Sequence, residues 1–500
     1  MSPDSLTSLL GNLWSIFLIV LFFGGSIFVH ELGHFLAARR RGVRVERFSI
    51  GFGPALWKKR GKDGCEYRLS VLPLGGYVAL PQLADLSVIE GGEIARTRVL
   101  STGIDSGPVN SERELPPISY ATKMIVFVAG AVFNVLFAFI LACVLWVVGQ
   151  QTSEELSTTR IGYVTETIAL PDGTTVPSPA HEAGLQIGDT IRAIDGQTVK
   201  DWPDMMQTLV TSFGQAEDGR REAIFSIERA GRTFDVTVYP RLVTEDKVRK
   251  VGIVAAYTPI VADVPKKSFA ETLGLKTGDA LTAINGAPLL NLLTLHDALQ
   301  KKPAQVFTLT IKRGQQTLDL SVPADRPKES SEILGAAYRT TTGFIHTNPV
   351  TQIVGHASMM IRVLYSLVHP HSDINASKLS GPVGIGKIFW DASEAGLRYV
   401  IWITILVNVN LALFNLLPIP VLDGGQMLFA TIGKLRGRAL STNFVATSQS
   451  IFMVLLLSLI VYVSVFDIGR IRRDSKADAK AREAAAEQKK DADQPAPAKP

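Results

Sequence analysis

The chain has 500 residues, of which 46% are hydrophobic and 19% are charged, and its formal net charge is +5. This mixture is typical of a membrane protein that carries soluble parts. The basic excess does not indicate nucleic-acid binding, because many basic residues flank apolar segments, as at residues 39–41 and 58–60. With two cysteines, Cys65 and Cys143, neither a disulfide framework nor a cysteine metal site is expected.

The first apolar segment contains a His-Glu-Leu-Gly-His motif at residues 30–34, directly after an uncharged stretch at residues 16–29. Four residues of a helix advance by about 400°, so His30 and His34 project from the same face, one turn apart. Two imidazoles placed in this way can share one zinc ion, and Glu31 can act as general base on an activated water molecule.

This motif also occurs by chance in helices that bind no metal. Inside an apolar span the chance explanation is weaker, because ionisable side chains at membrane depth are costly and usually persist for function. Polar side chains in such surroundings also need partners. The sequence therefore predicts a zinc site in the first span.

Four segments are apolar over roughly the 20 residues that are needed to cross a bilayer. The first is not expected to be a signal peptide, because no basic region precedes it and Arg39 to Arg41 follow it. We expect transmembrane helices at about residues 16–38, 124–148, 399–421 and 444–466.

Basic residues beside these segments predict the orientation of the chain. Arg39 to Arg41 place residues 39–123 in the cytoplasm, so residues 150–398 lie outside and the loop at residues 434–438 is cytoplasmic again. The tail would then lie outside, but Arg470, Arg472, Arg473 and Lys476 follow the last span closely, so the sequence leaves the side of the tail open.

The first cytoplasmic loop contains two segments in which apolar and polar residues alternate, residues 43–48 and 66–72. Alternation with period two is typical of strands, so we expect these segments to form a β-hairpin.

The outer region contains a repeat. Residues 183–196 read AGLQIGDTIRAIDG, and residues 273–286 read LGLKTGDALTAING. Downstream, the strand-like residues 227–238 correspond to residues 311–322. The repeat predicts two tandem β-rich domains of about 90 residues each.

The repeated Gly-Leu-x-x-Gly-Asp pattern resembles the PDZ domains that are attached to bacterial proteases, and the resemblance covers both copies. PDZ domains bind extended C-termini by adding a strand to a sheet edge, so C-terminal peptides are expected ligands. The alternative is that one or both domains bind nothing and act as steric spacers. The second copy lacks an obvious carboxylate-binding loop, so its ligand stays open.

A catalytic zinc ion usually has three protein ligands and one open position, so two histidines are not sufficient. The third apolar segment ends in NLLPIPVLDGG at residues 415–425, where prolines and glycines predict irregular backbone. Such backbone at membrane depth is tolerated where it lines a polar cavity, so Asp423 is the expected third ligand. Its alternative role is a helix cap at the membrane interface.

These motifs together resemble the bacterial site-2 protease family, RseP type, whose members regulate envelope-stress signalling. The resemblance covers about residues 16–466. Gln426 departs from it, because relatives often carry His there; this position is not a ligand in the family pattern, so zinc binding is not in doubt. The matching stretches are His30-Glu31-x-x-His34, GFGP at 51–54, PLGGY at 73–77, SGPVGI at 380–385 and Asn415-x-x-Pro-x-Pro-x-x-Asp423-Gly.

The resemblance implies a role for each motif residue. His30, His34 and Asp423 would hold Zn²⁺, and Glu31 would activate water and pass its proton to the leaving amine. Competing with this enzyme is a non-catalytic membrane scaffold with PDZ recognition domains. The presence of Glu31 and Asp423 disfavours the scaffold, which needs neither residue.

The family pattern also implies that Asn410 and Asn415 contact or position the substrate backbone. Their alternative role is hydrogen bonding between helices. That role is the expected one for Asn408, which has no counterpart in the family pattern. Gly130 and Asn134 are expected to serve close helix packing.

The expected function is a zinc-dependent intramembrane endopeptidase that cleaves single-span membrane proteins. A transmembrane helix hides its amides in internal hydrogen bonds, so cleavage requires local unwinding. We expect the hairpin edge at Leu69, Ser70 and Val71 to bind the unwound substrate through main-chain hydrogen bonds. The alternative is a plain cytoplasmic hairpin.

The resemblance implies anti-sigma factors, already trimmed by an outer protease, as substrates, with remnant signal peptides as a second candidate. It implies a multi-pass protein of the bacterial inner membrane, with PDZ domains on the periplasmic side and the active site near the cytoplasmic leaflet. The expected partners are these substrates, the lipid bilayer and C-terminal peptide ligands, and no nucleic acid.

The expected fold is a polytopic α-helical membrane protein with a membrane-associated β-hairpin and two PDZ domains inserted between the second and third spans. Its parts are the first helix (1–42), the cytoplasmic loop (43–119), the second helix (120–150), the PDZ domains (160–242 and 250–326), a juxtamembrane amphipathic segment (345–395), the third helix (396–425), the fourth helix (443–468) and a charged tail that begins as a frayed helix and ends in disorder (470–500).

Overall fold

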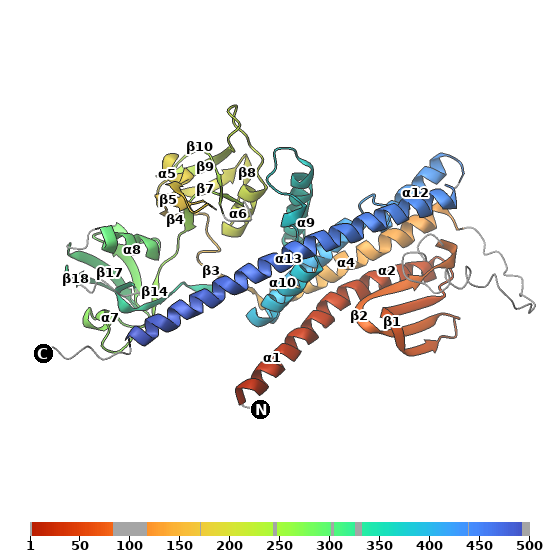
Figure 1. The fold of residues 1–500 in the computed structure, drawn as a ribbon, viewed down its shortest axis with the longest axis horizontal. Coiled ribbons are helices and arrows are strands. Elements are labelled where there is room, and N and C mark those ends of the chain that lie inside the picture. The colour runs from red at the N-terminus through yellow and green to blue at the C-terminus, as the bar shows by residue number, and fades with distance from the viewer. Residues whose placement is uncertain are drawn as a thin grey trace, which may run out of the picture. The chain divides into compact units, whose positions relative to one another are not determined.

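The computed structural model describes residues 3–83, 118–170, 172–243, 248–301, 305–325, 333–438 and 440–492. The chain divides into two compact units (Figure 1). The helical unit comprises residues 1–150, 346–360 and 376–500, and the β-rich unit comprises residues 151–345 and 361–375.

Among its described residues, the helical unit contains four helices that are long and apolar enough to cross a membrane, so the four predicted spans are confirmed. The first span is interrupted by one π-helical turn, η1. The helices concerned are α1 (Pro3–Ile19), η1 (Val20–Gly24) and α2 (Gly25–Arg40), then α4 (Tyr120–Val148), α11 (Leu397–Asn415) and α13 (Thr442–Ala492).

Helix α4 packs against both α2 and α11. It begins after Ser119, whose hydroxyl accepts a hydrogen bond from the backbone N–H of Thr122 and so caps the helix. Its buried residues include Ala129, Gly130 and Ala131. Small residues let helix backbones approach closely in a membrane, where no hydrophobic effect drives helices together.

The third predicted span is shorter than expected. Helix α11 ends at Asn415, and a separate helix, α12 (Asp423–Leu435), begins after an irregular turn. Pro418 and Pro420 lie in this turn, where their missing N–H groups and fixed backbone angle do not allow the helix to continue.

The predicted amphipathic segment forms helix α9 (Pro349–Val368), the short turn η4 (Ala376–Lys378) and helix α10 (Pro382–Ala395). Helix α10 packs against α1, α11 and α13. The charged tail from residue 470, which was expected to begin as a frayed helix and to end in disorder, is helical as far as Ala492, where α13 ends. Residues 493–500 lie outside the described residues.

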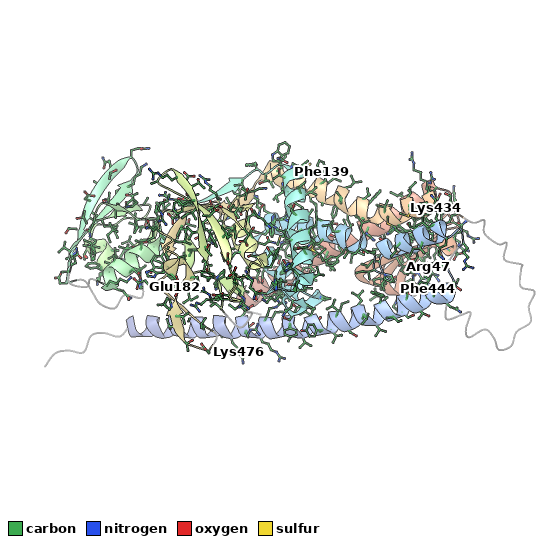
Figure 2. All side chains as sticks on the ribbon, turned by 90° about the horizontal axis from the view of Figure 1, so that it is seen from above. Arg47, Phe139, Glu182, Lys434, Phe444 and Lys476 are labelled. Atoms are coloured by element: carbon green, nitrogen blue, oxygen red, sulfur yellow. The ribbon has the colours of Figure 1, made fainter. Side chains whose placement is uncertain are left out.

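The predicted hairpin is present as β1 (Arg47–Arg60) and β2 (Glu66–Ala79), so residues 43–46 precede it and do not belong to it. Both strands bend, and in β1 the bend coincides with Gly51 and Gly53, which adopt the left-handed backbone conformation that favours glycine. Arg47 consequently pairs with both Glu66 and Ala79. Figure 2 shows Arg47 and Lys434 toward the same end of the helical unit, away from Lys476.

The β-rich unit contains two modules of similar topology. The first has a sheet in the order β10-β9-β7-β8 and a separate pair, β13-β4. Its elements are β4 (Ile161–Val164), β5 (Thr167–Ala169), β6 (Thr175–Pro177), α5 (Pro179–Glu182), β7 (Thr190–Ile194), β8 (Gln197–Thr198), α6 (Trp202–Thr211), β9 (Ala223–Arg229), β10 (Arg232–Val238), β11 (Arg241–Val243), β12 (Val248–Lys250) and β13 (Ile253–Ala255).

The second module has a sheet in the order β18-β17-β15-β14-β19, with β16 paired to β15. Its elements are β14 (Ile260–Asp263), α7 (Phe269–Thr272), β15 (Ala280–Ile284), β16 (Ala287–Pro288), α8 (Leu292–Lys301), β17 (Phe307–Arg313), β18 (Gln316–Val322), η3 (Ile333–Gly335) and β19 (Ala337–Arg339).

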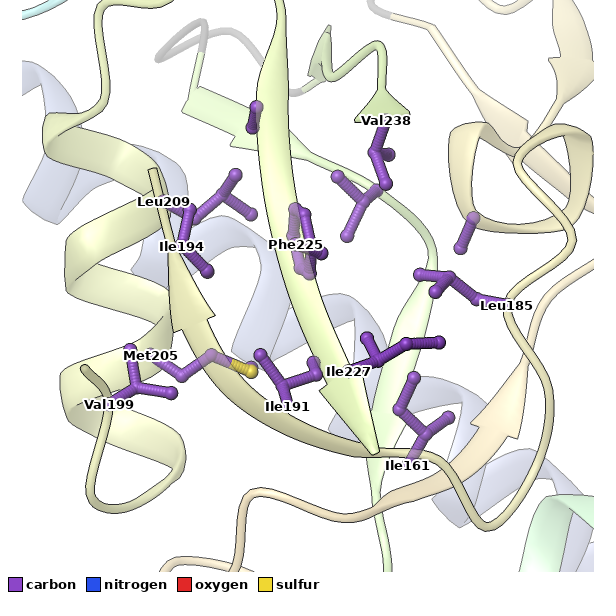
Figure 3. Close-up of a cluster of buried hydrophobic side chains, with 13 residues drawn as sticks. Ile161, Leu185, Ile191, Ile194, Val199, Met205, Leu209, Phe225, Ile227 and Val238 are labelled. Carbon is purple, nitrogen blue, oxygen red and sulfur yellow. The ribbon is translucent and has the colours of Figure 1, made fainter. Parts of the chain in front are cut away.

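Each module has its own buried core. In the first, strand residues such as Ile191 and Phe225 meet Met205 and Leu209 of α6 (Figure 3). Alternating strand residues and one face of an amphipathic helix supply these side chains, as the periodicity of the sequence predicts.

The repeated Gly-Asp pair has the same structural role in both modules. The buried Asp189 accepts hydrogen bonds from Arg229, which also donates to the carbonyl of Gly184. Asp279 and Arg313 form the same ion pair in the second module. The tandem repeat is therefore structural as well as sequential.

The predicted domain ends at residues 242 and 326 are too early. Strand β13 pairs with β4 and completes the first module, and β19 pairs with β14 and completes the second. These closing strands lie beyond the repeated motif, so the motif alone could not mark them.

The two modules contact each other within the β-rich unit. The Tyr163 hydroxyl donates to the Asp297 carboxylate at 2.5 Å, and the Asn291 side chain donates to the Ala255 carbonyl. Burial and then this hydrogen bond raise the pKa of Tyr163 to about 12. Strand β3 (Gln150–Ser153), which enters the unit, pairs with β20 (Thr342–Ile345), which leaves it.

Candidate metal centre

Helix α2 brings His30 and His34 together. Their Nε2 atoms lie 3.1 Å apart, and the ring centroids lie 4.7 Å apart. Both histidines lie one turn apart on the same helix face, as the four-residue spacing predicts.

Asp423 reaches this pair from the first residue of α12. Its Oδ2 lies 3.3 Å from Nε2 of His30 and 3.3 Å from Nε2 of His34. The alternative role as a helix cap is not observed, because the N-terminus of α12 has no side-chain cap hydrogen bond. The sequence-predicted third ligand is thus brought to the two histidines over nearly 400 residues of chain.

Two glycines make this position of Asp423 possible. A Cβ atom on Gly424 would lie 2.4 Å from the carbonyl oxygens of Leu416 and Leu417, and one on Gly425 would lie 2.0 Å from the carbonyl oxygen of Ile419. The side-chain amide of Gln426 donates to the Pro420 carbonyl. The turn therefore needs glycine at these two positions, and Gln426 braces it without approaching the histidines.

The spacing of these three atoms fits one metal ion. Ligands about 2.0–2.1 Å from a tetrahedral zinc ion lie about 3.3–3.4 Å from one another. The three ligand atoms are separated by 3.1, 3.3 and 3.3 Å. In addition, Oδ2 of Asp423 is buried without a hydrogen-bond partner. Among the described residues, this is the only group of three such side chains that could hold a metal.

Neighbouring groups orient both imidazoles. Nδ1 of His34 donates to the carbonyl of Val126 at 2.7 Å, which leaves Nε2 unprotonated and free to bind a metal. Nδ1 of His30 lies 3.4 Å from the side-chain amide of Asn134. The amide oxygen of Asn134 is buried without a partner, so a turned amide would accept Nδ1–H of His30.

Asn134 is therefore a site residue, whereas the sequence predicted only a packing role. It lies one helical turn after Gly130, on the same face of α4. A Cβ atom on Gly130 would lie 2.4 Å from Nε2 of His34 and 2.6 Å from Cε1 of His30. A glycine and an asparagine four residues apart in an otherwise apolar span were the signal that could have identified this face.

Glu31 lies beside the hairpin. A Cβ atom on Gly76 of β2 would lie 3.2 Å from Cγ of Glu31 and 2.8 Å from the carbonyl oxygen of Ser49. The segment of β2 from Gly76 to Ala79 pairs with β1 on one side only, among the described strands. The segment from Gly76 to Ala79 is thus the open strand edge that lies next to Glu31.

The predicted edge at Leu69, Ser70 and Val71 is wrong at Leu69, whereas Ser70 pairs on one side and Val71 pairs with no strand residue in the described part of the chain. Leu69 pairs on both sides, with Ile50 and with Trp57, and Ser70 is buried and pairs with Ala55. Because β1 and β2 each bend and pair with each other twice, residues 66–69 of β2 lie between two segments of β1 and are not at the edge of the sheet. The side chains of Leu69 and Val71 remain exposed.

The three asparagines of α11 differ in their contacts. The side-chain amide of Asn415 lies 3.5 Å from Nε2 of His30, at the site. Asn408 donates to the hydroxyl of Ser26 and so links α11 to α2, which confirms its expected role between helices. The side-chain oxygen of Asn410 is buried with no hydrogen-bond partner in the described part of the chain.

A cluster of two histidines and an aspartate, with a glutamate beside it and the histidines on a helix apolar enough to cross a membrane, is the arrangement of an intramembrane metalloprotease. The model of Peptidase family M50 matches residues 17–459, so the chain belongs to this family and is a zinc metalloprotease of the bacterial site-2 type, RseP type. It is an intramembrane protease of the inner membrane with several spans.

Curated relatives match nearly the whole chain. The regulator of sigma-E protease RseP of Escherichia coli is 29% identical over 477 residues, which cover 91% of this chain and 99% of the relative. Its counterpart from Salmonella typhimurium is 28% identical with the same coverage. A protein from Vibrio cholerae that is named as a zinc metalloprotease is 28% identical over 445 residues, 84% of this chain and 90% of the relative.

Proposed function

We propose that this protease cleaves the membrane-spanning segment of single-span membrane proteins, with His30, His34 and Asp423 as its zinc ligands and Glu31 as its general base. The observation that carries the proposal is the convergence of the three ligand atoms at separations of 3.1–3.3 Å. That spacing, together with the His34 imidazole, whose Nδ1–H is bound to the Val126 carbonyl, matches the donor set of a catalytic zinc ion.

When bound, zinc supplies Lewis-acid activation of water and of the scissile carbonyl. Glu31 accepts a proton from the attacking water at its carboxylate and passes it to the leaving nitrogen as the C–N bond breaks. The oxygen of the water joins the carbonyl carbon, so one acid and one amine are released. Asn415, next to His30, is in reach of a substrate carbonyl at the same place.

The substrate must be locally unwound before it is cut, because a membrane helix hides its amides in internal hydrogen bonds. The open strand edge from Gly76 to Ala79 can replace those bonds by strand addition. This edge lies beside Glu31, so it would hold the unwound segment next to the general base. Main-chain hydrogen bonds of this kind supply affinity with little choice of sequence.

The relatives named regulators of sigma-E protease suggest the substrate class. We propose that the substrates are anti-sigma factors trimmed by a first outer cleavage, with remnant signal peptides as a second class. Basic residues at 39–41 and 434–438 support an active site near the cytoplasmic leaflet. The two β-rich modules would then be periplasmic PDZ domains that bind C-terminal peptides or exclude substrates with bulky outer domains.

The zinc content of an Asp423→Ala variant tests the ligand set. We expect the wild type to bind zinc and to cleave a model single-span substrate in detergent or liposomes, and we expect the variant to lose most of its zinc and its cleavage. The matched control is Asp391→Ala, which removes an exposed aspartate of α10 that pairs with Lys387. Unchanged zinc affinity in Asp423→Ala would place the third ligand elsewhere.

A further inference from the structure

The first module contains a buried cation whose counter-ion comes from far along the chain. The side chain of Arg249, in β12, is only 1% exposed. Its Nε donates to the carboxylate of Asp373 at 2.7 Å, and its Nη1 donates to the hydroxyl of Ser212 at 3.2 Å. Arg221 donates to both oxygens of the same carboxylate, at 2.8 and 3.0 Å. The side chains of Arg221 and Arg249 thus both form ion pairs with the carboxylate of Asp373.

Asp373 lies at the end of a segment that follows α6 along its length. Arg362 donates to Asp204 near the start of α6 and to Thr208 one turn further on, and the hydroxyl of Ser366 donates to the carbonyl of Thr211 at the end of the helix. His369 stacks on Phe213 with ring centroids 4.0 Å apart. We call residues 361–375, all of which belong to the β-rich unit, the strap.

Arg249 also lies close in the chain to the start of an open strand edge. Arg249 precedes β13 by only a few residues, and β13 pairs with β4 on one side while no described strand pairs with its other side. A peptide that adds antiparallel to this edge has its C-terminus beside the start of β13. Its terminal carboxylate would therefore arrive at Arg249 and Arg221.

We propose that Asp373 is an internal carboxylate plug, which occupies the arginine pair of the first module and competes there with the C-terminal carboxylate of a peptide. This inference rests on the proposed peptide-binding role of the module and is independent of catalysis. The plug closes the site until a peptide C-terminus displaces the strap.

The second module lacks arginines at the two corresponding positions, and this difference supports the plug proposed for the first module. Gly252 directly precedes β13 in the first module, and Gly335 lies two residues before β19 in the second; the two glycines correspond when Ala255, paired with Ile161, is matched to Tyr338, paired with Val261. Three residues before these glycines, the first copy has Arg249 and the second copy has Glu332. Likewise, the residue two positions before β9 in the first copy is Arg221, and the residue two positions before β17 in the second copy is Gln305. The arginine pair is thus specific to the first copy, and so is the need for a plug.

The test is peptide binding to the full-length chain in a Glu31→Gln background, in which the peptide is not cut. The probe is a fluorescent six-residue peptide that ends in valine with a free carboxylate, and its amidated form is the reference. If the plug is closed in nine of ten molecules, Asp373→Asn should bind the free-carboxylate peptide about tenfold more tightly than the parent. The amidated peptide should gain nothing.

Three further variants make the outcome decisive. Asp218→Asn, the same change in an exposed ion pair of the same module, should leave affinity unchanged. Adding Arg249→Gln to Asp373→Asn should abolish the gain. Arg362→Gln loosens the strap without touching the arginine pair, so it should also raise affinity, even if Asp373→Asn fails to fold.

The possible failures are distinguishable. Equal affinity of the parent, Asp373→Asn and Arg362→Gln for the free-carboxylate peptide would overturn the plug while leaving peptide binding intact. Absence of binding in every variant would overturn both the plug and the proposed peptide-binding role of this module. Neither result would bear on the proposed zinc ligands or on the proposed general base.

Discussion

At the scale of single residues, the candidate site separates ligands from base by their contacts. The side chains of His30, His34 and Asp423 contact one another. On the other side of the two imidazoles, Nδ1 of His34 contacts the Val126 carbonyl and Nδ1 of His30 contacts the Asn134 amide. Glu31, by contrast, makes no side-chain hydrogen bond in the described part of the chain, so its carboxylate is available to exchange protons. These different environments explain how one short motif can supply both metal ligands and a base.

Glu31→Gln should keep zinc and lose cleavage. The amide preserves the shape of the side chain but cannot accept the proton, and loss of a general base typically slows a reaction by about 10²- to 10⁴-fold. Zinc content by mass spectrometry and cleavage of a model substrate are the two readouts. Near-normal turnover with full zinc occupancy would remove Glu31 from the mechanism.

Asn134→Ala should weaken zinc binding although Asn134 is not a ligand. Loss of a group that orients a ligating histidine typically lowers metal affinity by about 10- to 100-fold. Asn408→Ala is the control, because Asn408 is also a buried membrane asparagine but contacts Ser26 and not a histidine. Chelator competition measures both affinities; equal losses in the two variants would contradict an orienting role.

At the scale of elements, the site depends on how closely α2 and α4 approach. A Cβ atom on Gly33 of α2 would lie 2.5 Å from the carbonyl oxygen of Ala129 in α4, and one on Gly130 of α4 would overlap the imidazole of His34. Backbone atoms and the rings of the ligands fill the space beside both glycines. The helix pair can therefore not accept larger residues without moving the ligands.

Gly130→Ala should accordingly reduce zinc affinity and activity together. Its methyl group would force α4 away from the two histidines, and a displacement of about 1 Å at an active site can lower activity about 100-fold. Gly25→Ala is the matched control, since a Cβ atom there would meet nothing within 4 Å. If Gly130→Ala matched Gly25→Ala in zinc content and turnover, the close approach would not be needed.

At the scale of the whole molecule, the larger part of the β-rich unit, residues 151–345, is inserted through neighbouring strands, and residues 361–375 return to the same unit. Its incoming strand β3 and outgoing strand β20 pair, and the backbone N–H of Glu154 donates to the carbonyl of Thr341 at 3.0 Å. The points where the chain enters and leaves the two modules are thus adjacent. Both modules can be removed between these residues without stretching the remaining chain.

Replacing residues 154–341 with a short glycine linker tests whether the modules exclude bulky substrates. If they do, the deletion variant should retain zinc and cleave untrimmed substrates that the intact protein rejects. Cleavage rates of trimmed and untrimmed forms are compared in both proteins. Continued discrimination after the deletion would contradict exclusion, and slower cleavage of the trimmed form would favour recruitment by the modules.

Local patterns in the amino-acid sequence were sufficient to predict several parts of this protein. Apolar length predicted the four spans, helical spacing predicted the pairing of His30 with His34, and the repeat predicted two β-rich modules. It also predicted Asp423 as third ligand, because a carboxylate on irregular backbone in an apolar segment needs a partner. Each of these inferences rests on a local pattern of residues or on its repetition, and none requires knowledge of which distant segments pack together.

Only the tertiary structure decided the features that depend on packing between distant segments. Asn134 meets His30 because α4 lies against α2, and Leu69 is interior because β1 and β2 double back on each other. The strands that complete the modules and the clasp of Asp373 by Arg249 join residues far apart in the chain. Local periodicity carries no information on which distant surfaces meet, since packing of whole elements sets that register.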